Sequence, residues 1–369
     1  MDLSACPELD LGEWGDALAA SLGGRRYPLG GTLELTERCN LRCVHCYINQ
    51  PAGSPAARSR ELAIAEVGGI LDQMADAGCL FLLLTGGEVL LRPDFEEIYR
   101  YARGRGMLVS LFTNATLLTP AIADLLAYSR PHSIEITLYG ATQETYEAVT
   151  QIPGSYARCR RGIELLLERG LPLTLKSVLL TTNRHELAAM QALAGELDVK
   201  FRYDGTLWPR LDGGEQPYDY RLSLEEMLAL DREDPDRWRQ WEDTARSFSG
   251  QLVRAEYVYS CGAGINTFHI DSAGRMSICT MARRPSYDLQ QVRFEDAWDA
   301  LGALRQQVRR LDTACRTCTA GGLCTQCPGW SQAVHGDDET PVEYVCELGR
   351  LRVAQIQQAI IEHRGEEDL

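Results

Sequence analysis

The stretch GTLELTERCNLRCVHC, residues 31–46, joins a β-type run directly to three cysteines. Its first six residues are typical of a strand, and Cys39, Cys43 and Cys46 follow with the spacing C-x3-C-x2-C. Three thiolates on one loop can hold three irons of a 4Fe–4S cube. The fourth iron then has no protein ligand, and such an open position is where a catalytic metal binds its substrate or cofactor. The spacing alone also permits a zinc site.

Apolar β-type runs alternate with helical patterns from residue 31 to residue 204. Strands that alternate with helices predict a parallel sheet with right-handed crossovers. Because six such units are too few for a closed eight-stranded barrel, we expect an α/β fold with a partial (β/α)6 TIM-like barrel. Its functional loops should lie at the carboxyl ends of the strands. The expected strands are residues 31–36, 80–84, 107–112, 133–138, 173–180 and 199–203.

The rest of the chain divides by composition into further parts. Residues 1–30 form an N-terminal segment before the barrel at 31–204, and residues 205–255 form a polar bridging region with two expected helices. Residues 256–350 are rich in glycine and cysteine, and residues 351–369 form a C-terminal helix and tail. Because the segment 256–350 has little apolar content for a core, we expect a small α+β domain that bound metal organises.

The cysteine count and the charge narrow the class of protein. Ten of the thirteen cysteines fall in two clusters, and in a reducing cytosol such clusters indicate metal ligands rather than disulfides. The formal net charge of −15 argues against a nucleic-acid partner, whose backbone rewards positive charge. The first residues lack a signal-peptide pattern, and no apolar run approaches the length of a membrane span. We therefore expect a soluble cytoplasmic protein that binds neither nucleic acid nor membrane.

The cysteine loop and a second motif resemble the radical SAM superfamily, whose enzymes use S-adenosylmethionine (SAM). Thr85-Gly86-Gly87-Glu88 follows the second expected strand, as the Gly-Gly-Glu motif of that superfamily does. The resemblance implies that the open iron chelates the amino and carboxylate groups of SAM, and that one-electron reduction then gives a 5′-deoxyadenosyl radical. Two glycines let the backbone approach a ligand closely, and Glu88 would accept hydrogen bonds from the ammonium group. An ordinary βα turn is the alternative for the glycines.

Polar side chains near the ends of the later strands are candidates to bind the ribose and carboxylate of SAM. Each of them alone can instead finish a turn. His45 would lie beside the adenine by the same resemblance, and its alternative is a packed surface histidine. The strand-end candidates are Thr113 and Asn114 after the third strand, Glu135 and Thr137 in the fourth, Lys176 in the fifth and Asn183 just past it.

A second cysteine set has the spacing C-x12-G-x4-C, then C-x2-C-x5-C-x2-C, then a last cysteine after eighteen residues. It resembles the SPASM extension of radical SAM enzymes that mature peptides and proteins, although that family usually has three residues in the last short gap. The first auxiliary site would keep an open iron unless a nearby side chain or the substrate completes it. Two structural zinc sites are the alternative. The resemblance implies two auxiliary iron–sulfur clusters, the first on Cys261, Cys279 and Cys327 and the second on Cys315, Cys318, Cys324 and Cys346.

The SPASM resemblance also implies a reaction. It predicts a radical SAM oxidoreductase that abstracts hydrogen from a ribosomally made precursor peptide and gives a crosslinked or oxidised product. The alternatives are a sulfatase-type formylglycine maturase and a non-catalytic zinc- or iron-binding interaction module. Expected partners are the precursor peptide and an electron donor such as flavodoxin or ferredoxin. Because residues 1–30 are too few for a fused leader-recognition domain, a leader would need a separate leader-recognition protein or would dock directly.

The end of the sixth expected strand supplies the candidates for chemistry on the substrate. Asp204 should face the barrel mouth, where it can accept a proton or anchor the substrate. An aspartate that caps the turn before Gly205 is the alternative. Tyr203, Trp208 and Arg210 are weaker candidates.

Overall fold

One continuous sheet of nine strands organises the computed structural model, which describes residues 21, 25–48, 50–247 and 256–367. Six of its strands run parallel in one row, and they are the six expected from the βα repeats. The prediction of a partial parallel barrel is therefore confirmed. In spatial order the six are β1 (Gly30–Glu34), β4 (Phe81–Thr85), β5 (Leu108–Thr113), β6 (Ser133–Thr137), β7 (Leu173–Val178) and β8 (Lys200–Asp204).

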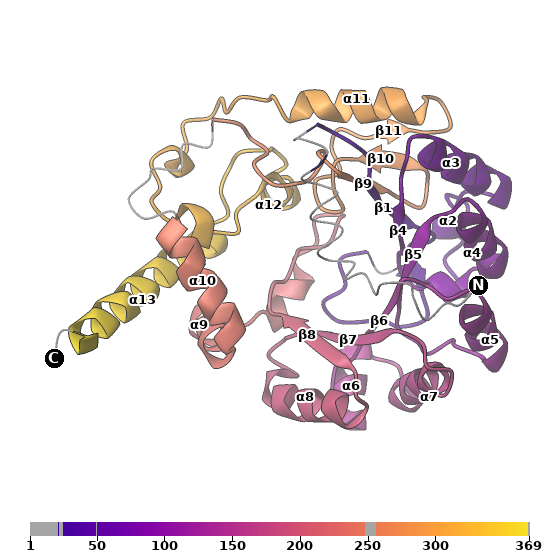
Figure 1. Ribbon diagram of the computed structural model, residues 1–369, viewed down its shortest axis with the longest axis horizontal. Coiled ribbons are helices and arrows are strands. Elements are labelled where there is room, and N and C mark those ends of the chain that lie inside the picture. Colours follow the sequence, from indigo (N-terminus) through magenta and orange to yellow (C-terminus); the bar gives the residue numbers. More distant parts are fainter. Residues whose placement is uncertain (1–20, 22–24, 49, 248–255, 368–369) are drawn as a thin grey trace.

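The helices that connect these strands lie on the outer side of the curved sheet (Figure 1). Capping residues in the local sequence set where these helices begin. At α5, for example, the Thr119 hydroxyl accepts a hydrogen bond from the Ile122 N–H at 3.3 Å, and Pro120 takes the first helical position. The elements are α2 (Pro55–Arg58), α3 (Ile64–Asp76), η2 (Val89–Leu91), α4 (Phe95–Gly104), α5 (Pro120–Tyr128), α6 (Gln143–Thr150), α7 (Ser155–Leu167), η3 (Arg184–Glu186) and α8 (Leu187–Glu196).

The two faces of the barrel sheet differ in character because side chains alternate along each strand. On β5 and β6, Leu111 and Ile136 are fully buried on one face, whereas Phe112 and Glu135 on the other face are half-buried. Phe112 pairs with Glu135 in register, so the half-buried side chains form a row across neighbouring strands. The apolar face forms the core with the helices, and the other face lines the barrel interior.

The cysteine-rich region adds three strands to the same sheet. Strand β9 (Thr267–Ile270) runs parallel beside β1, and β10 (Arg275–Ser277) and β11 (Tyr287–Asp288) continue antiparallel. The sheet thus crosses from the barrel into the region expected to form a second domain. The division of the chain near residue 255 stays a prediction.

A helical group lies beside the barrel, to the left in Figure 1. There α9 (Leu224–Glu233) and α10 (Pro235–Ser247) pack with α13 (Glu343–Glu367), and the buried Arg352 donates to Asp231 at 2.7 Å. None of the described helices combines the length and apolar composition that crossing a membrane needs. The remaining elements are η4 (Gln216–Tyr220), α11 (Phe294–Leu304), η5 (Ala314–Arg316), η6 (Gly321–Leu323) and α12 (Pro328–Val334).

Candidate functional site

The three-cysteine loop begins at the carboxyl end of β1 and is held on two sides. Cys39 ends the short strand β2 (Arg38–Cys39), which pairs with β3 (Gln50–Pro51). Further along, the main-chain N–H groups of Arg42 and Val44 each donate at 3.0 Å to carbonyls at the end of α6. The thiols of Cys39, Cys43 and Cys46 lie close enough to influence one another, and burial followed by these neighbours raises the pKa of Cys43. The structure therefore brings the three predicted ligands together.

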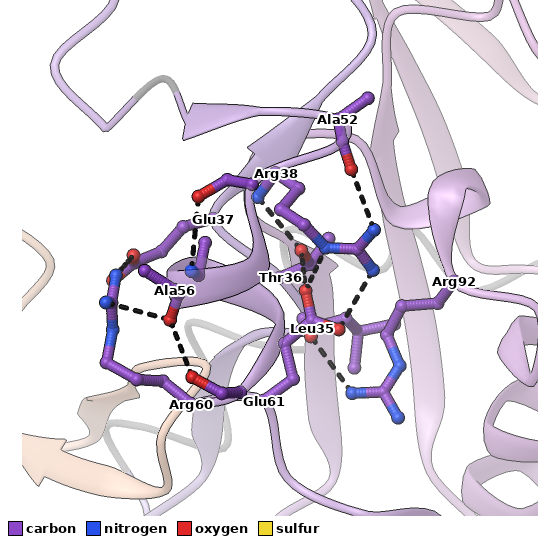
Figure 2. Close-up of polar contacts among 12 residues, drawn as sticks. Leu35, Thr36, Glu37, Arg38, Ala52, Ala56, Arg60, Glu61 and Arg92 are labelled. Atoms are coloured by element: carbon purple, nitrogen blue, oxygen red, sulfur yellow. Dashed lines mark hydrogen bonds and ion pairs between the residues drawn. The ribbon is translucent and has the colours of Figure 1, made fainter.

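A buried polar network supports the start of this loop (Figure 2). The Arg38 guanidinium donates to both carboxylate oxygens of Glu61, at 2.6 and 3.0 Å, and to the Ala52 carbonyl at 3.0 Å. Thr36 donates to the same carboxylate and accepts from the Arg38 N–H at 2.9 Å. Below it, Arg92 donates to the Leu35 carbonyl at 3.2 Å. Each charge in the network has a partner, which is what keeps a buried ion pair favourable.

The Gly-Gly-Glu segment packs directly against the cysteine loop. The Gly87 N–H donates to the Thr36 carbonyl at 2.7 Å, and the Glu88 N–H donates to the Arg38 carbonyl at 2.9 Å. A Cβ atom at Gly86 or Gly87 would fall well inside van der Waals contact of those same two carbonyls, and Gly86 has φ +133°. The sequence predicted that the glycines serve close approach to a ligand. The structure shows that they serve close approach of two loops.

Glu88 is fully buried, and its carboxylate orders the end of β5. It accepts from the Thr113 hydroxyl and the Asn114 N–H, both at 2.7 Å, and from the Leu90 N–H at 3.1 Å. Burial raises the pKa of Glu88 above its usual value, whereas these bonds lower it. The Asn114 amide then donates to Cys39 Sγ at 3.6 Å. In this structure Glu88 thus acts on the cluster loop through Asn114, and its bond to the ammonium group of SAM stays a prediction.

Charged side chains meet inside the barrel on three neighbouring strands. Lys176 Nζ lies 3.2 Å from Glu135 Oε2 and 2.9 Å from the centre of the Phe112 ring. Arg202 of β8 contacts the same carboxylate. Burial lowers the pKa of Lys176 to about 7, although Glu135 opposes this. Sequence reasoning found Glu135 and Lys176 but missed Arg202, which the alternation of β8 would place on the same face.

The other predicted SAM contacts divide into two kinds. Thr137 ends β6 half-buried beside Lys176 in register, which keeps it at the barrel mouth. Asn183 is fully buried, and its amide bonds the Leu180 N–H and the carbonyls of Tyr139 and Val178 at 2.7 to 3.1 Å. The amide of Asn183 thus forms a turn in this structure, as the alternative requires, and its contact with SAM stays a prediction.

His45 is buried beside the cysteine loop rather than packed on the surface. Its ring lies edge-on to Tyr139, with 5.0 Å between ring centres. Burial lowers its pKa to about 4, so the ring is neutral at pH 7. Its Nδ1 has no hydrogen-bond partner among the described residues. A buried nitrogen without a partner suits a ligand bound at this loop.

The seven distal cysteines form the two groups that the resemblance implied. Burial and then the neighbouring thiols Cys279 and Cys261 raise the pKa of Cys327, which places these three together. Burial and then Cys324 and Cys315 raise the pKa of Cys346 to about 11, and Cys318 lies beside Cys324 in the same way. The shortened gap before Cys327 does not disturb this grouping.

Main-chain donors at the sulfur atoms suit iron–sulfur ligation. Cys279 Sγ accepts from the Met281 and Ala282 N–H groups at 3.3 and 3.1 Å. Such bonds stabilise thiolates and tune clusters. Similar N–H···S bonds, at 3.4 Å, reach Cys39, Cys318 and Cys324.

Among the described residues, no three His, Cys, Asp or Glu side chains are placed to share one metal ion. In a 4Fe–4S cube each cysteine binds its own iron, so the sulfurs need not converge on one point.

The candidates for chemistry on the substrate lie apart from one another. Asp204 is exposed at the end of β8, and its carboxylate accepts from the Thr206 N–H at 3.0 Å, as the turn-capping alternative requires. Tyr203 points to the opposite face of β8, where its hydroxyl donates to Asp234 at 3.2 Å. Strand alternation thus turns Tyr203 toward α10, where Arg237 lies over its ring, and a role for Tyr203 in the chemistry stays a prediction.

The last two candidates belong to the bridging region. Arg210 pairs with Asp212 at 3.2 Å, and the neighbouring Leu211 N–H donates to the Tyr47 carbonyl at 2.9 Å, so this segment docks beside the cysteine loop. Trp208 stacks on Trp330 with 3.9 Å between ring centres and joins the bridging region to α12. A catalytic role for Asp204 or Arg210 stays a prediction.

Comparison with known proteins places the barrel in a family. Residues 33–194 match the model of the radical SAM superfamily. The AdoMet-dependent heme synthase of Methanosarcina barkeri is 28% identical over 82% of this chain and 92% of that protein. The mycofactocin maturase MftC of Mycobacterium tuberculosis is 27% identical over 83% of this chain and 78% of that protein. Streptococcus suis SuiB bound to precursor peptide SuiA shares the fold, with TM-score 0.65 at 17% identity over 90% of this chain and 80% of that one.

A partial parallel barrel with three clustered thiols at its carboxyl edge defines an α/β protein built to hold an iron–sulfur cluster. The family match identifies which one: the barrel, over residues 33–194, is a radical SAM domain. A domain of this kind binds one 4Fe–4S cluster and SAM. The alternative of a non-catalytic interaction module is wrong.

Proposed function

We propose that this radical SAM enzyme modifies a ribosomally made precursor peptide and leaves it crosslinked or oxidised. One observation carries the proposal: the same chain holds the three-cysteine loop at the barrel edge and seven further cysteines in two groups beside it. The similarity to mycofactocin maturase extends over both regions, since it covers 83% of the chain. The shared fold with SuiB adds a peptide-binding example of the same architecture.

We assign the ligands as the sequence predicted. Cys39, Cys43 and Cys46 hold the cluster that, once reduced, cleaves SAM and starts hydrogen abstraction. Asn114 donates to Cys39 Sγ and Glu88 fixes Asn114, so both keep this loop in shape. His45 stays neutral because of its burial and presents Nδ1 beside the loop.

Two auxiliary iron–sulfur clusters belong to the proposal. One is held by Cys261, Cys279 and Cys327, and these clusters would accept the electron that the oxidised substrate releases. The N–H···S bonds at Cys279 and the burial of Cys327 support a site prepared for metal. The second site consists of Cys315, Cys318, Cys324 and Cys346.

The barrel interior supplies the surface where the substrate would dock. Lys176 and Arg202 share the single carboxylate of Glu135, so this row carries an excess of positive charge. In a chain with a net charge of −15, that local excess favours an anionic group of SAM or substrate. We further propose a separate leader-recognition protein, flavodoxin or ferredoxin as electron donor, and a cytoplasmic location, where the thiols stay reduced.

The first experiment tests the enzyme class and its loop. The anaerobically reconstituted chain with dithionite should convert SAM to 5′-deoxyadenosine. Replacing Cys39, Cys43 and Cys46 by Ala should abolish this conversion, whereas the matched variant Cys79→Ala should retain it, because Cys79 belongs to neither cysteine cluster. Conversion by the triple variant would refute the assignment of the loop.

The second experiment tests the substrate. A short peptide encoded beside this gene should lose hydrogen atoms when incubated with the enzyme and SAM, as followed by mass spectrometry. Oxidation of a single Cys or Ser to formylglycine in a sulfatase peptide would instead support the sulfatase-type maturase.

A second candidate function is heme formation. The observation that favours it is the similarity to the Methanosarcina barkeri heme synthase, which covers 92% of that protein. The same assay distinguishes the two: a porphyrin precursor incubated with enzyme and SAM would yield the heme absorption spectrum, and the neighbouring peptide would stay unchanged.

A further inference from the structure

Two exposed arginines beside the three-cysteine loop carry charges that no carboxylate neutralises. Arg42 lies within the loop, directly before Cys43, and Arg158 lies in the first turn of α7. The Arg42 guanidinium donates to the Gln151 carbonyl at 3.4 Å, and the Arg158 guanidinium donates to the Pro153 carbonyl at 3.5 Å. Neither arginine forms an ion pair within the described part of the chain. A guanidinium that bonds only neutral carbonyls keeps its full charge for a partner.

The turn between α6 and α7, residues 150–155, holds both arginines in place. Pro153 fixes one backbone dihedral, and Gly154 takes φ +73°. The buried hydroxyls of Thr150 and Ser155 lie 2.7 Å apart, and the Ser155 N–H donates to the Ile152 carbonyl at 3.1 Å. The turn is therefore preformed, and a partner that binds it has little chain to order.

This turn packs directly on the three-cysteine loop. The Arg42 N–H donates to the Thr150 carbonyl at 3.0 Å. The Val44 N–H donates to the Val149 carbonyl at the same distance. Helices α6 and α7, which the turn joins, lie beside each other on the outer side of the sheet (Figure 1). A molecule that docks on the turn therefore meets the loop that carries the predicted cluster ligands.

The carboxylate nearest in sequence to the turn does not neutralise the arginines. The Glu147 side chain accepts from the Tyr156 N–H at 3.4 Å and from the Gln143 amide at 3.3 Å. Its main-chain carbonyl accepts from the Gln151 N–H at 2.9 Å. Glu147 thus helps to shape the turn, and among the described residues it forms an ion pair with neither arginine.

The exposed residues of this region form a surface with an apolar centre and a cationic rim. The half-exposed Ile152 and the exposed Pro153 make the centre, and Arg42 and Arg158 flank it. These four residues and Gln151 are called the turn surface below. Charged groups around an apolar centre are typical of protein interfaces. In a chain with a net charge of −15, the two unpaired cations attract an acidic partner to this one place.

We propose that the turn surface is where an acidic flavodoxin docks to reduce the cluster on the three-cysteine loop, an inference that rests on the proposed function. In the encounter, reduced flavodoxin loses one electron and the oxidised cluster gains it; no bond forms or breaks. Electron-transfer encounters use small interfaces, so a surface of this size suffices. The apolar centre suits the exposed edge of a flavin ring, and the two guanidinium groups suit carboxylates around that edge.

The test compares flavodoxin with dithionite, a reductant too small to need a docking surface. The anaerobically reconstituted full chain is assayed for conversion of SAM to 5′-deoxyadenosine with each reductant. Arg42→Gln combined with Arg158→Gln should slow the reaction about tenfold at subsaturating flavodoxin, because each exposed ion pair contributes a few-fold to binding. The rate with dithionite should stay unchanged, since glutamine keeps the main-chain N–H of residue 42 in its bond.

A binding measurement gives a second readout that needs no turnover. NMR titration of 15N-labelled oxidised flavodoxin with the reconstituted chain gives the Kd, which the double variant should raise by the same factor. Added salt should weaken binding to the wild-type chain more than binding to the double variant. Arg158→Gln alone should raise the Kd about threefold. This single variant keeps the test independent of any effect of Arg42 on the cysteine loop.

Arg130→Gln is the matched control. Arg130 is also exposed and also donates to a main-chain carbonyl, that of Gly170, but it lies just before β6, at the opposite end of the strands. Its substitution should change neither the rates nor the Kd. A Kd that the double variant does not raise would overturn the inference alone, and so would a wild-type chain that binds no flavodoxin. A wild-type chain that cleaves no SAM with dithionite would overturn the proposed function as well.

Discussion

Glu88 shows how a single side chain can serve a site without touching its ligand. Its Oε1 accepts from Thr113 and Leu90, and its Oε2 accepts from the Asn114 N–H. A glutamine at this position must turn its NH2 group toward one of the two main-chain donors. The residue therefore has to be a carboxylate even before SAM is present.

Glu88→Gln should consequently destabilise the metal-free chain by about 1–3 kcal/mol, the cost of one buried unpaired donor. Urea unfolding of the apo protein measures this. Glu96→Gln is the control, because Glu96 is an exposed partner in an i,i+4 pair with Arg100 and should change stability by less than about 0.5 kcal/mol. Equal stability of the two variants would show that Glu88 acts on SAM alone.

A second prediction concerns Lys176, because burial lowers the pKa of its ammonium group to about 7. Between pH 7 and the usual lysine value, the unfolded chain binds a proton that the native chain has lost. Stability should therefore rise with pH in this window, and Lys176→Met should remove that rise. The groups that face it are Glu135, Arg202 and the Phe112 ring.

The chain has only two lysines, so the titration can be read directly. NMR of the chain reductively methylated with 13C should give two lysine signals besides that of the N-terminal amine, and Lys176→Met assigns the signal of Lys176. The Lys176 signal should titrate near pH 7. A Lys176 signal that stays unchanged through pH 7 would contradict the burial argument.

At the scale of elements, the loop after β4 and the loop after β1 depend on each other through two glycines. Gly87→Ala would push a methyl group into the Arg38 carbonyl, which cannot move while Arg38 is tied to Glu61. The variant should lose the iron of the three-cysteine loop, about four atoms per chain, and keep that of the auxiliary sites. Iron analysis measures this.

Gly69→Ala is the control, because it adds the same methyl group at a glycine where the methyl group has room. Gly69 lies within α3, and a Cβ there meets nothing within 4 Å. Alanine should keep all the iron and raise stability by about 0.5–1 kcal/mol through its better helix propensity. Loss of iron in both variants would mean that the Gly87 effect is not local.

The sequence was informative for elements whose signals are local. The six parallel strands and the Pro120 helix start follow from periodicity and capping. Pairing of β1 with β9 was missed, because Gly30 and Thr267 are remote in the chain and only folding brings them together. The same reason limits what the sequence predicts for single residues. The face that Tyr203 occupies depends on the register of β8, and the direction of the Asn183 side chain depends on how its loop folds back.

At the scale of the whole molecule, the barrel and the cysteine-rich region share more than a sheet. Glu34 ends β1 and is completely buried, and Arg283 reaches it from the segment after Cys279 with bonds of 2.6 and 3.0 Å. Burial raises the pKa of Glu34, and Arg283 opposes this. The buried His269 lies 3.8 Å away, and burial lowers its pKa to about 3, so it adds no charge. One ion pair thus connects the strand before the three-cysteine loop to the segment that follows Cys279.

This connection should make the two regions unfold together. Arg283→Met leaves the Glu34 carboxylate buried without a partner and should cost about 3–5 kcal/mol, whereas adding Glu34→Gln should recover much of the loss. Urea unfolding of the metal-free chain measures both variants. Arg100→Met, which breaks an exposed pair on α4, should cost less than about 1 kcal/mol. Tryptophan fluorescence reports on the part of the chain after residue 204, where all the described tryptophans lie, and far-UV circular dichroism reports on the helices of both regions. The two signals should give one coincident transition, because a shared sheet and a buried charge pair leave neither region a stable state of its own. Two separate transitions, or an Arg283→Met cost no larger than that of Arg100→Met, would show that the sheet continues across two independently stable units.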